Sequence, residues 1–337
     1  EMAARGLPGR VIYLGCPAEE VLVGKGFMAR GGAFTDLDCV VDFHPASTNV
    51  VSMGRSTAVY SANFHFKGIT AHAAFDPQNG RSALDAVELM NVGANYLREH
   101  ITSDVRLHYI ITEGGVAPNI VPDRASSRYF VRAFTMDACK SVYDRLVKVA
   151  RGAAMMTETE LEIEYLGGCY ERQPIAALAE LLQAALSEAP RPVWDAADRE
   201  LAAALNNTMP ELTASIIATN NLPADSVLHD GVLPISYTDM FASTDVGDVQ
   251  HIVPGASFTT ATMNLGAPGH SWQTAACSGS AIGMKGMLYA AKTFALFGLK
   301  VLENPEVLAA AQADFQQKMQ GKTYDCPVTP EMTVPGI

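Results

Sequence analysis

The order of strands and helices predicted between residues 57 and 168 constrains the fold of this chain more than any other feature. Residues 59–68 alternate apolar and polar side chains, which is typical of a half-exposed strand. Two helices and three further strands follow in the order α-β-β-α-β, over residues 80–100, 106–112, 126–134, 137–156 and 160–168. The complete β-α-β-β-α-β order predicts a ferredoxin-like α+β domain built on an antiparallel sheet.

The residues on both sides of this region predict a second sheet of a different kind. Residues 10–14 and 39–43 are short, continuous apolar runs that end in turn-forming residues, with a partly helical segment between them. Such runs are typical of parallel strands that are covered on both faces. The segment 275–302 is rich in Met, Leu and Ala, and it predicts a long, mostly buried helix that packs against this sheet.

Together these patterns predict a split organisation. Residues 1–55 plus 171–337 would form an α/β domain with its sheet flanked by helices, and residues 57–168 would be inserted as a separate domain. A chain of 337 residues exceeds the length at which a single core stops growing, which agrees with two domains. Residues 1–9 resemble the end of a helix and carry no initiator Met, so we expect that residues preceding Glu1 are missing.

Composition and charge argue against several classes of function. A net charge of −12 disfavours nucleic-acid binding, which requires basic patches, and it disfavours anionic membranes as well. No run of about 18 apolar residues is free of charged residues, so no membrane span is predicted. The six cysteines are scattered and form no CxxC pair, which favours reduced thiols in a cytoplasmic protein over a disulfide framework.

Two adjacent carboxylates, Glu19 and Glu20, follow the turn at residues 15–17 that ends the first apolar run. Neighbouring side chains point in different directions, so one carboxylate could bind a metal ion while the other remains free as a general base. The alternative interpretation, a solvated pair at the end of a strand, stays open.

Two histidines are candidate ligands for the same site. His44 follows the second apolar run, and Pro45 favours an extended backbone that would project the His44 ring from the carboxyl end of the strand. His270 lies in an exposed turn rich in glycine and proline. If the two strands are neighbours, Glu20 and His44 can converge. A structural role for His44 and a surface-loop role for His270 are the alternatives.

Two further candidates lie in loops of the inserted domain. His72 is expected to act as a mobile donor to a reacting carbonyl, or else to be a capping or loop residue. Asn119 lies in a loop rich in Gly and Pro, where its amide could bind a substrate carboxylate or hold the loop together. No GxSxG, P-loop or dinucleotide-binding fingerprint occurs, which argues against nucleophilic and nucleotide chemistry.

Six motifs, in order along the chain, resemble the aminoacylase/carboxypeptidase G family of metallopeptidases. They are GCPAEE, the His-Pro pair after DCVVDF, GITAHAAFDPQNGRSALDA, EGGVAPNIVPD, ASTDVGDV and GAPGHSW. The matches begin near Gly9 and end near the long helix, so they cover most of the chain. The resemblance implies a phosphorylase/hydrolase-like α/β catalytic domain that binds two divalent ions, zinc or manganese, and a smaller lid domain that mediates dimerisation.

The resemblance also implies roles for the residues of the catalytic domain. Glu19 is expected to be the general base, and Glu20 a metal ligand. His44 is expected to bind one ion, and His270 to share the other ion with Glu20. These side chains, distant in sequence, would have to meet in one cleft.

For the lid, the resemblance implies that His72 reaches into the active site of the partner subunit and polarises the scissile carbonyl. Asn119 would help to hold the substrate carboxylate. Arg132 could assist it, or could be only a surface residue of its strand. Asp245 lies in a matching motif but has no assigned role.

The branch of the family that the chain resembles carries further ligands, a Cys and a His in a Gly-Cys-Gly-His type segment upstream of the GCPAEE motif. The 337 residues contain no such segment. We therefore expect these residues alone to bind metal weakly and to show negligible activity.

The leading hypothesis is a metal-dependent amidohydrolase that cleaves a small-molecule amide, an N-acyl or N-aroyl amino acid such as aminobenzoyl-glutamate. A dipeptidase or an aminoacylase with another acyl preference is the second. The third is a metal-free, degenerate subunit that acts as an interaction protein. We expect a homodimer through the lid, because an exposed edge strand invites pairing, and a heteromer with a related subunit is the alternative.

Overall fold

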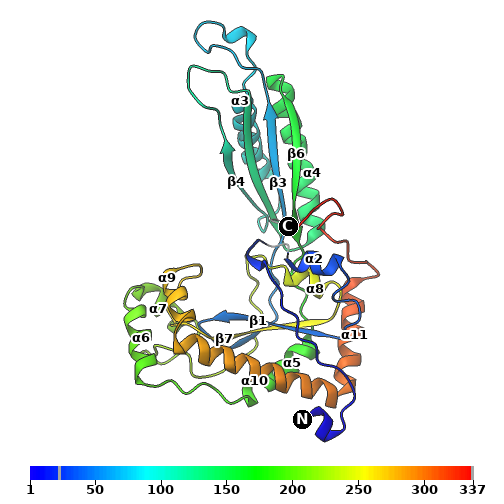
Figure 1. The fold of residues 1–337 in the computed structure, drawn as a ribbon, viewed down its shortest axis with the longest axis vertical. Helices are drawn as coiled ribbons and strands as arrows, with labels where there is room; N and C mark the ends of the chain where they lie inside the picture. Colours follow the sequence, from blue (N-terminus) through cyan, green and yellow to red (C-terminus); the bar gives the residue numbers. More distant parts are fainter. Residues whose placement is uncertain (22–23, 335–337) are drawn as a thin grey trace.

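The computed structural model describes residues 1–21 and 24–334 of the chain. Two sheets, one of four strands and one of three, lie in different parts of an elongated molecule (Figure 1). The four-stranded sheet, formed by residues 58–169, extends away from the three-stranded sheet, around which the other helices gather.

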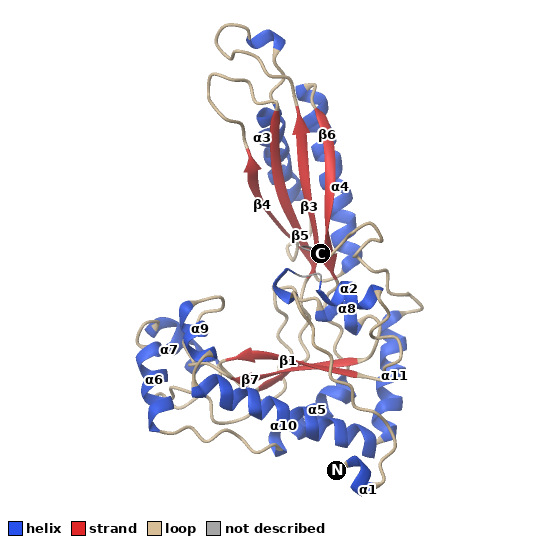
Figure 2. Ribbon diagram, in the orientation of Figure 1, coloured by secondary structure: helices blue, strands red, loops and turns tan. Residues whose placement is uncertain are grey.

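The four-stranded sheet has the predicted element order, which is confirmed. Its strands are β3 (Ala58–Lys67), β4 (Arg106–Glu113), β5 (Arg124–Ala133) and β6 (Glu160–Cys169). They are antiparallel, in the order β4-β5-β3-β6. Helices α3 (Ala83–Leu97) and α4 (Met136–Thr157) cover one face of this sheet (Figure 2). The arrangement is the ferredoxin-like α+β fold.

Local sequence explains why α3 and α4 begin where they do. The Ser82 side chain accepts a hydrogen bond from the Asp85 backbone N–H, and the Thr135 side chain accepts one from the Ala138 N–H. Each cap satisfies a backbone donor that the first helical turn leaves without a partner. The apolar stripes of both helices then pack on Phe64 of β3 and its buried neighbours.

The three-stranded sheet contains β1 (Val40–Ala46), β2 (Val50–Ser52) and β7 (Gly255–Ala261), in the order β1-β7-β2. β1 runs parallel to β7, a strand that the sequence analysis did not predict, and β2 runs antiparallel to β7, so the sheet is mixed and not parallel as expected. Helices α5 (Ala176–Glu188), α10 (Ala281–Glu303) and α11 (Pro305–Met319) share a core with this sheet. Buried residues such as Leu178, Leu182 and Phe258 form that core.

The prediction of a strand over residues 10–14 is also wrong. β1 lies at the edge of its sheet in the part of the chain that the structure describes, and residues 10–14 pair with no strand there. A strand needs a neighbour to satisfy its backbone hydrogen bonds, so an apolar run is not sufficient by itself. The Tyr13 side chain is accordingly 92% exposed.

The helix predicted over residues 275–302 is in fact two helices. α9 (Trp272–Ser278) ends at Gly279, and α10 begins after Ser280, whose side chain accepts a hydrogen bond from the Ile282 N–H. The capping serine therefore starts a new helix. α10 is also less buried than predicted, because Met284 and Leu288 are exposed on one face.

Five short helices complete the described residues, together with three 3₁₀ turns. They are α1 (Met2–Arg5), α2 (Gly24–Arg30), α6 (Ala196–Asn206), α7 (Pro210–Thr219), α8 (Val246–Gln250), η1 (Glu19–Val21), η2 (Pro77–Asn79) and η3 (Arg98–His100). Within residues 1–21 and 24–334, none of the helices has the length and apolarity needed to cross a membrane. All six cysteines carry free thiols.

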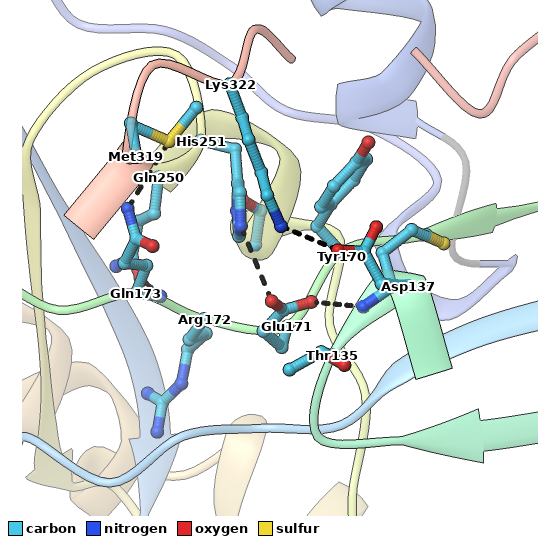
Figure 3. Close-up of polar contacts among 12 residues, drawn as sticks. Thr135, Asp137, Tyr170, Glu171, Arg172, Gln173, Gln250, His251, Met319 and Lys322 are labelled. Carbon is cyan, nitrogen blue, oxygen red and sulfur yellow. Dashed lines mark hydrogen bonds and ion pairs between the residues drawn. The ribbon is translucent and has the colours of Figure 1, made fainter. Parts of the chain in front are cut away.

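A polar network joins the four-stranded sheet to the rest of the chain (Figure 3). Glu171, just after β6, accepts a hydrogen bond of 2.9 Å from the Met136 N–H at the start of α4 and lies 3.5 Å from His251 Nε2. Lys322, from the C-terminal segment, donates to Asp137 at 2.6 Å. The base of α4 is therefore held from two sides.

Candidate active site

The two adjacent carboxylates lie in a tight turn against the start of α2. Glu19 and Glu20 open the turn η1, directly after Ala18, whose φ of 60° lies in the left-handed region. A Cβ added at Gly24, the first residue of α2, would lie 1.8 Å from the Pro17 carbonyl oxygen. Only glycine permits this close approach, so the sequence of α2 helps to place the acidic turn.

The structure brings Glu20 and His270 together, although 250 positions separate them in the sequence. The Glu20 carboxylate lies 3.8 Å from His270 Nδ1, and both side chains are exposed, at 75% and 83%. His270 has a φ of 55°, so its turn is held in a conformation that non-glycine residues rarely adopt. A carboxylate oxygen and an imidazole nitrogen are ligand types that suit zinc and manganese.

His44 is not brought into this pair. It lies near the carboxyl end of β1, as predicted, and its Nδ1 is 2.8 Å from the carbonyl oxygen of Pro45. Among the described residues, no three His, Cys, Asp or Glu side chains lie close enough to hold one ion. The expected meeting of Glu20, His44 and His270 is therefore seen only for the first and the last.

A buried ion pair that sequence reasoning missed lies behind the acidic turn. Lys25 Nζ lies 2.7 Å from Asp245 Oδ1, and the Lys25 backbone N–H donates to Asp245 Oδ2 at 2.8 Å. The Asp245 side chain is fully buried, and that of Lys25 is 11% exposed. Burial lowers the pKa of Lys25, but the carboxylate of Asp245 outweighs this effect and raises that pKa, which favours the charged amine.

His72 and Asn119 lie side by side at the far end of the four-stranded sheet. The segment that carries His72 pairs with the segment that carries Asn119, since the Ala73 N–H donates a hydrogen bond to the Asn119 carbonyl oxygen at 2.9 Å. His72 Nδ1 accepts from the Phe75 N–H at 3.0 Å, and both candidate side chains are exposed. Between them and the base of the sheet runs β3, whose ten residues span about 30 Å at about 3.3 Å per residue.

Arg132 lies at the opposite end of the same sheet, near the base. Its Nη1 donates to Ser243 Oγ at 3.2 Å, and its Nε is buried without a hydrogen-bond partner. Arg132 and Asn119 therefore lie at different ends of β5 and do not form one site within a single chain. The Nε of Arg132 is therefore a buried donor without an acceptor among the described residues.

Comparisons with known proteins place these observations in a family. Residues 58–155 match the model of the peptidase dimerisation domain of M20 peptidases. The chain is 37% identical to one of the subunits of p-aminobenzoyl-glutamate hydrolase from Escherichia coli, over 97% of this chain and 72% of that protein. It is 29% identical to the Xaa-Arg dipeptidase of Mus musculus, over 95% of this chain and 65% of that protein.

A solved structure shows the same fold. The aminobenzoyl-glutamate utilization protein from Klebsiella pneumoniae superposes with a TM-score of 0.55 at 18% sequence identity, over 85% of this chain and 59% of that one. The motifs, the matched dimerisation domain and the identity to the Escherichia coli hydrolase agree. This chain belongs to the M20 peptidase family of hydrolases, the aminoacylase and carboxypeptidase G family that its motifs resemble.

Proposed function

We propose that this chain is a metal-dependent amidohydrolase that cleaves the amide bond of an N-aroyl or N-acyl amino acid, with p-aminobenzoyl-glutamate as its substrate. The observation that carries the proposal is the 3.8 Å approach of Glu20 and His270 beside Glu19. The identity of 37% to part of a hydrolase named for this substrate supports the choice of substrate.

Glu20 and His270, with His44, are the proposed ligands of two divalent ions, zinc or manganese. Exposed carboxylate and imidazole groups at close range fit such ions. When bound, an ion of this kind acidifies water and stabilises negative charge on a carbonyl oxygen.

Glu19 is the proposed general base. Its carboxylate accepts a proton from the attacking water and later donates that proton to the leaving amine nitrogen. Glu19 is adjacent to Glu20 in the turn, so a single rigid segment would hold the base beside the proposed ligand.

The lid function requires a second copy of the chain. His72 and Asn119 lie about 30 Å beyond the base of the sheet, whereas α2 and α8 lie at that base (Figure 1). His72 therefore polarises the scissile carbonyl of the partner's active site, and Asn119 binds the substrate carboxylate there. Arg132, whose guanidinium lies at the base of the sheet beside Ser243, is the proposed second donor to that carboxylate.

The proposed dimer surface is the β4 edge of the four-stranded sheet. β4 exposes Ile110 and Ile111, at 60% and 47%, and the neighbouring α3 exposes Val92 and Tyr96, at 49% and 73%. The other edge, β6, carries glutamates at alternate positions, which would repel a second copy of themselves. A homodimer through β4 is favoured, and a heteromer is the alternative, because the Escherichia coli relative is itself one subunit of its hydrolase.

We also propose the domain division that these roles require. Residues 1–55 plus 171–337 form the catalytic metal-binding domain, and residues 57–168 form the lid. The free thiols support a cytoplasmic location. A dipeptidase is the second candidate function, since the chain is 29% identical to the Xaa-Arg dipeptidase of Mus musculus.

The test compares the chain with its Glu19→Gln variant in hydrolysis of p-aminobenzoyl-glutamate and of a panel of dipeptides, with zinc or manganese in large excess. Because the sequence predicts negligible activity for these residues alone, the readout is the ratio of the two rates, measured at high protein concentration and over long incubation. We expect a loss of at least about 100-fold in the variant, with metal binding retained. Equal rates of hydrolysis for the chain and its Glu19→Gln variant would refute the proposal. Cleavage of dipeptides alone would favour the second candidate function. The absence of all hydrolysis would favour a degenerate subunit that acts as an interaction protein.

A further inference from the structure

The ion pair between Lys25 and Asp245 has no part in the chemistry described above, yet it is one of the most buried charged contacts of the molecule. Its two residues are 220 positions apart in the sequence. Both oxygens of the Asp245 carboxylate are used by one residue, one by the Lys25 ammonium and one by the Lys25 backbone N–H. The carboxylate therefore fixes the side chain and the backbone of Lys25 at the same time.

Lys25 follows the acidic turn closely and is the second residue of α2. The first turn of a helix has backbone N–H groups without partners inside the helix, and Asp245 satisfies one of them from a distant segment. Gly24, directly before Lys25, contacts the Pro17 carbonyl of the turn at a distance that no side chain would permit. Movement of Lys25 would therefore be passed to the turn that carries Glu19 and Glu20.

Asp245 is itself held by a segment that does not depend on the acidic turn. Residues 236–242 run beside the connection that leads into β3, with a bond of 2.7 Å from the Met53 N–H to the Ser236 carbonyl oxygen and one of 2.8 Å from the Thr57 N–H to that of Ala242. Asp245 then begins α8, which contacts α2. The anchor is therefore built into the base of the lid.

We propose that Lys25 and Asp245 are positioning residues that hold the Glu19–Glu20 turn in its working place against the base of the lid. The inference rests on the proposed function of Glu19 and deepens it. A buried ion pair contributes little net stability because its charges lose their hydration, but it selects one arrangement of the segments that it joins. Neither residue contacts the substrate in this proposal.

The test uses the variants Lys25→Met, Asp245→Asn and Lys25→Arg, the last of which keeps the charge. The matched control is Lys285→Met, which removes an ion pair with Asp195 (2.9 Å) and Asp198 on a different part of the molecule. Amide hydrogen exchange is measured for α2 and, as an internal reference, for residues 58–155. Hydrolysis is measured as kcat and KM separately.

We expect Lys25→Met and Asp245→Asn to speed exchange in α2 at least tenfold, with exchange in residues 58–155 unchanged. We expect kcat to fall about 100-fold with KM nearly constant, because a displacement of about 1 Å in a reacting group has an effect of this size. Lys25→Arg should restore most of kcat, and Lys285→Met should change neither readout.

If Lys25→Met and Asp245→Asn both show the wild-type exchange rate in α2, the inference is overturned. It is also overturned if exchange rises equally in residues 58–155, since that result reports general destabilisation. Faster exchange in α2 with a wild-type kcat would overturn it as well. If the unmodified chain cleaves no amide, the proposed function fails, whereas the exchange measurement still decides whether the pair holds the turn.

Discussion

Replacement of Gly24 by alanine should displace the acidic turn without touching any proposed catalytic group. The added Cβ would lie 1.8 Å from the Pro17 carbonyl oxygen and 3.0 Å from the Pro17 carbonyl carbon. A Cβ does not approach closer than about 3.0 Å to such an oxygen, so the turn and the helix must separate by about 3.0 − 1.8 = 1.2 Å. The obstacle is backbone, so it cannot be relieved by rotation of a side chain.

A displacement of about 1 Å at a reacting group can lower the rate about 100-fold, so Gly24→Ala should lower kcat by about this factor. The added crowding should also lower the free energy of unfolding by about 1–3 kcal/mol. Steady-state kinetics and urea unfolding of the same preparations measure the two effects.

Gly152→Ala is the matched control, because nothing lies within 4 Å of a Cβ added at Gly152 in the C-terminal part of α4. This variant should gain about 0.5–1 kcal/mol of stability from the better helix propensity of alanine, with kcat unchanged. If Gly24→Ala also retains the wild-type kcat, the turn does not need its present position, and the reasoning from its packing is wrong.

Three further predictions concern the dimer, a buried acid and the lid core. Ile110 is 60% exposed in the single chain, and covering its side chain in the dimer should contribute about 1.5 kcal/mol per subunit to association. Ile110→Ala should therefore raise the dimer Kd about 100-fold in sedimentation equilibrium. Val193→Ala, at a position that is 83% exposed elsewhere on the molecule, should leave the dimer Kd unchanged. Burial raises the pKa of the Asp248 carboxyl well above its ordinary value near 4. Above about pH 4 the unfolded chain therefore releases this proton, whereas the folded chain retains it. The contribution of Asp248 to the free energy of unfolding falls as the pH rises through this range. Asp248→Asn should therefore gain stability relative to wild type between pH 4 and 8 in urea unfolding; a difference independent of pH would contradict this. Leu146→Ala, at a fully buried position of α4, should cost about 2–5 kcal/mol in the same assay, and a loss below 1 kcal/mol would show that the lid core is loosely packed.

The domain of the four-stranded sheet was predictable because its patterns are local. Period-two alternation over β3 and helical spacing over α3 each come from neighbours in the sequence, and serine and threonine caps mark where the helices begin. The part of the chain around the three-stranded sheet was less predictable, since strand formation depends on partners. Residues 10–14 have the composition of a strand but no neighbour in the described residues, and the pairing of β2 against β7 follows no sequence pattern.

The candidate site shows the same division. The close approach of Glu20 and His270 was expected from motifs, and the structure brings the two together, but it leaves His44 apart. The ion pair between Lys25 and Asp245 was missed because its members are 220 positions apart in the sequence. The local indication was a lysine between two glycines, Gly24 and Gly26, five positions after Glu20, and it does not say where the partner lies.

The most direct test of the central claim is a zinc titration of the chain and its Glu20→Gln and His270→Ala variants, with a chromophoric chelator as competitor. If these two side chains share an ion, each variant should bind zinc at least about tenfold more weakly than the unmodified chain, and His100→Ala should bind as the unmodified chain does. Equal zinc affinity in all four proteins would show that the pair at 3.8 Å holds no metal, and would contradict the account of this site as a hydrolytic centre.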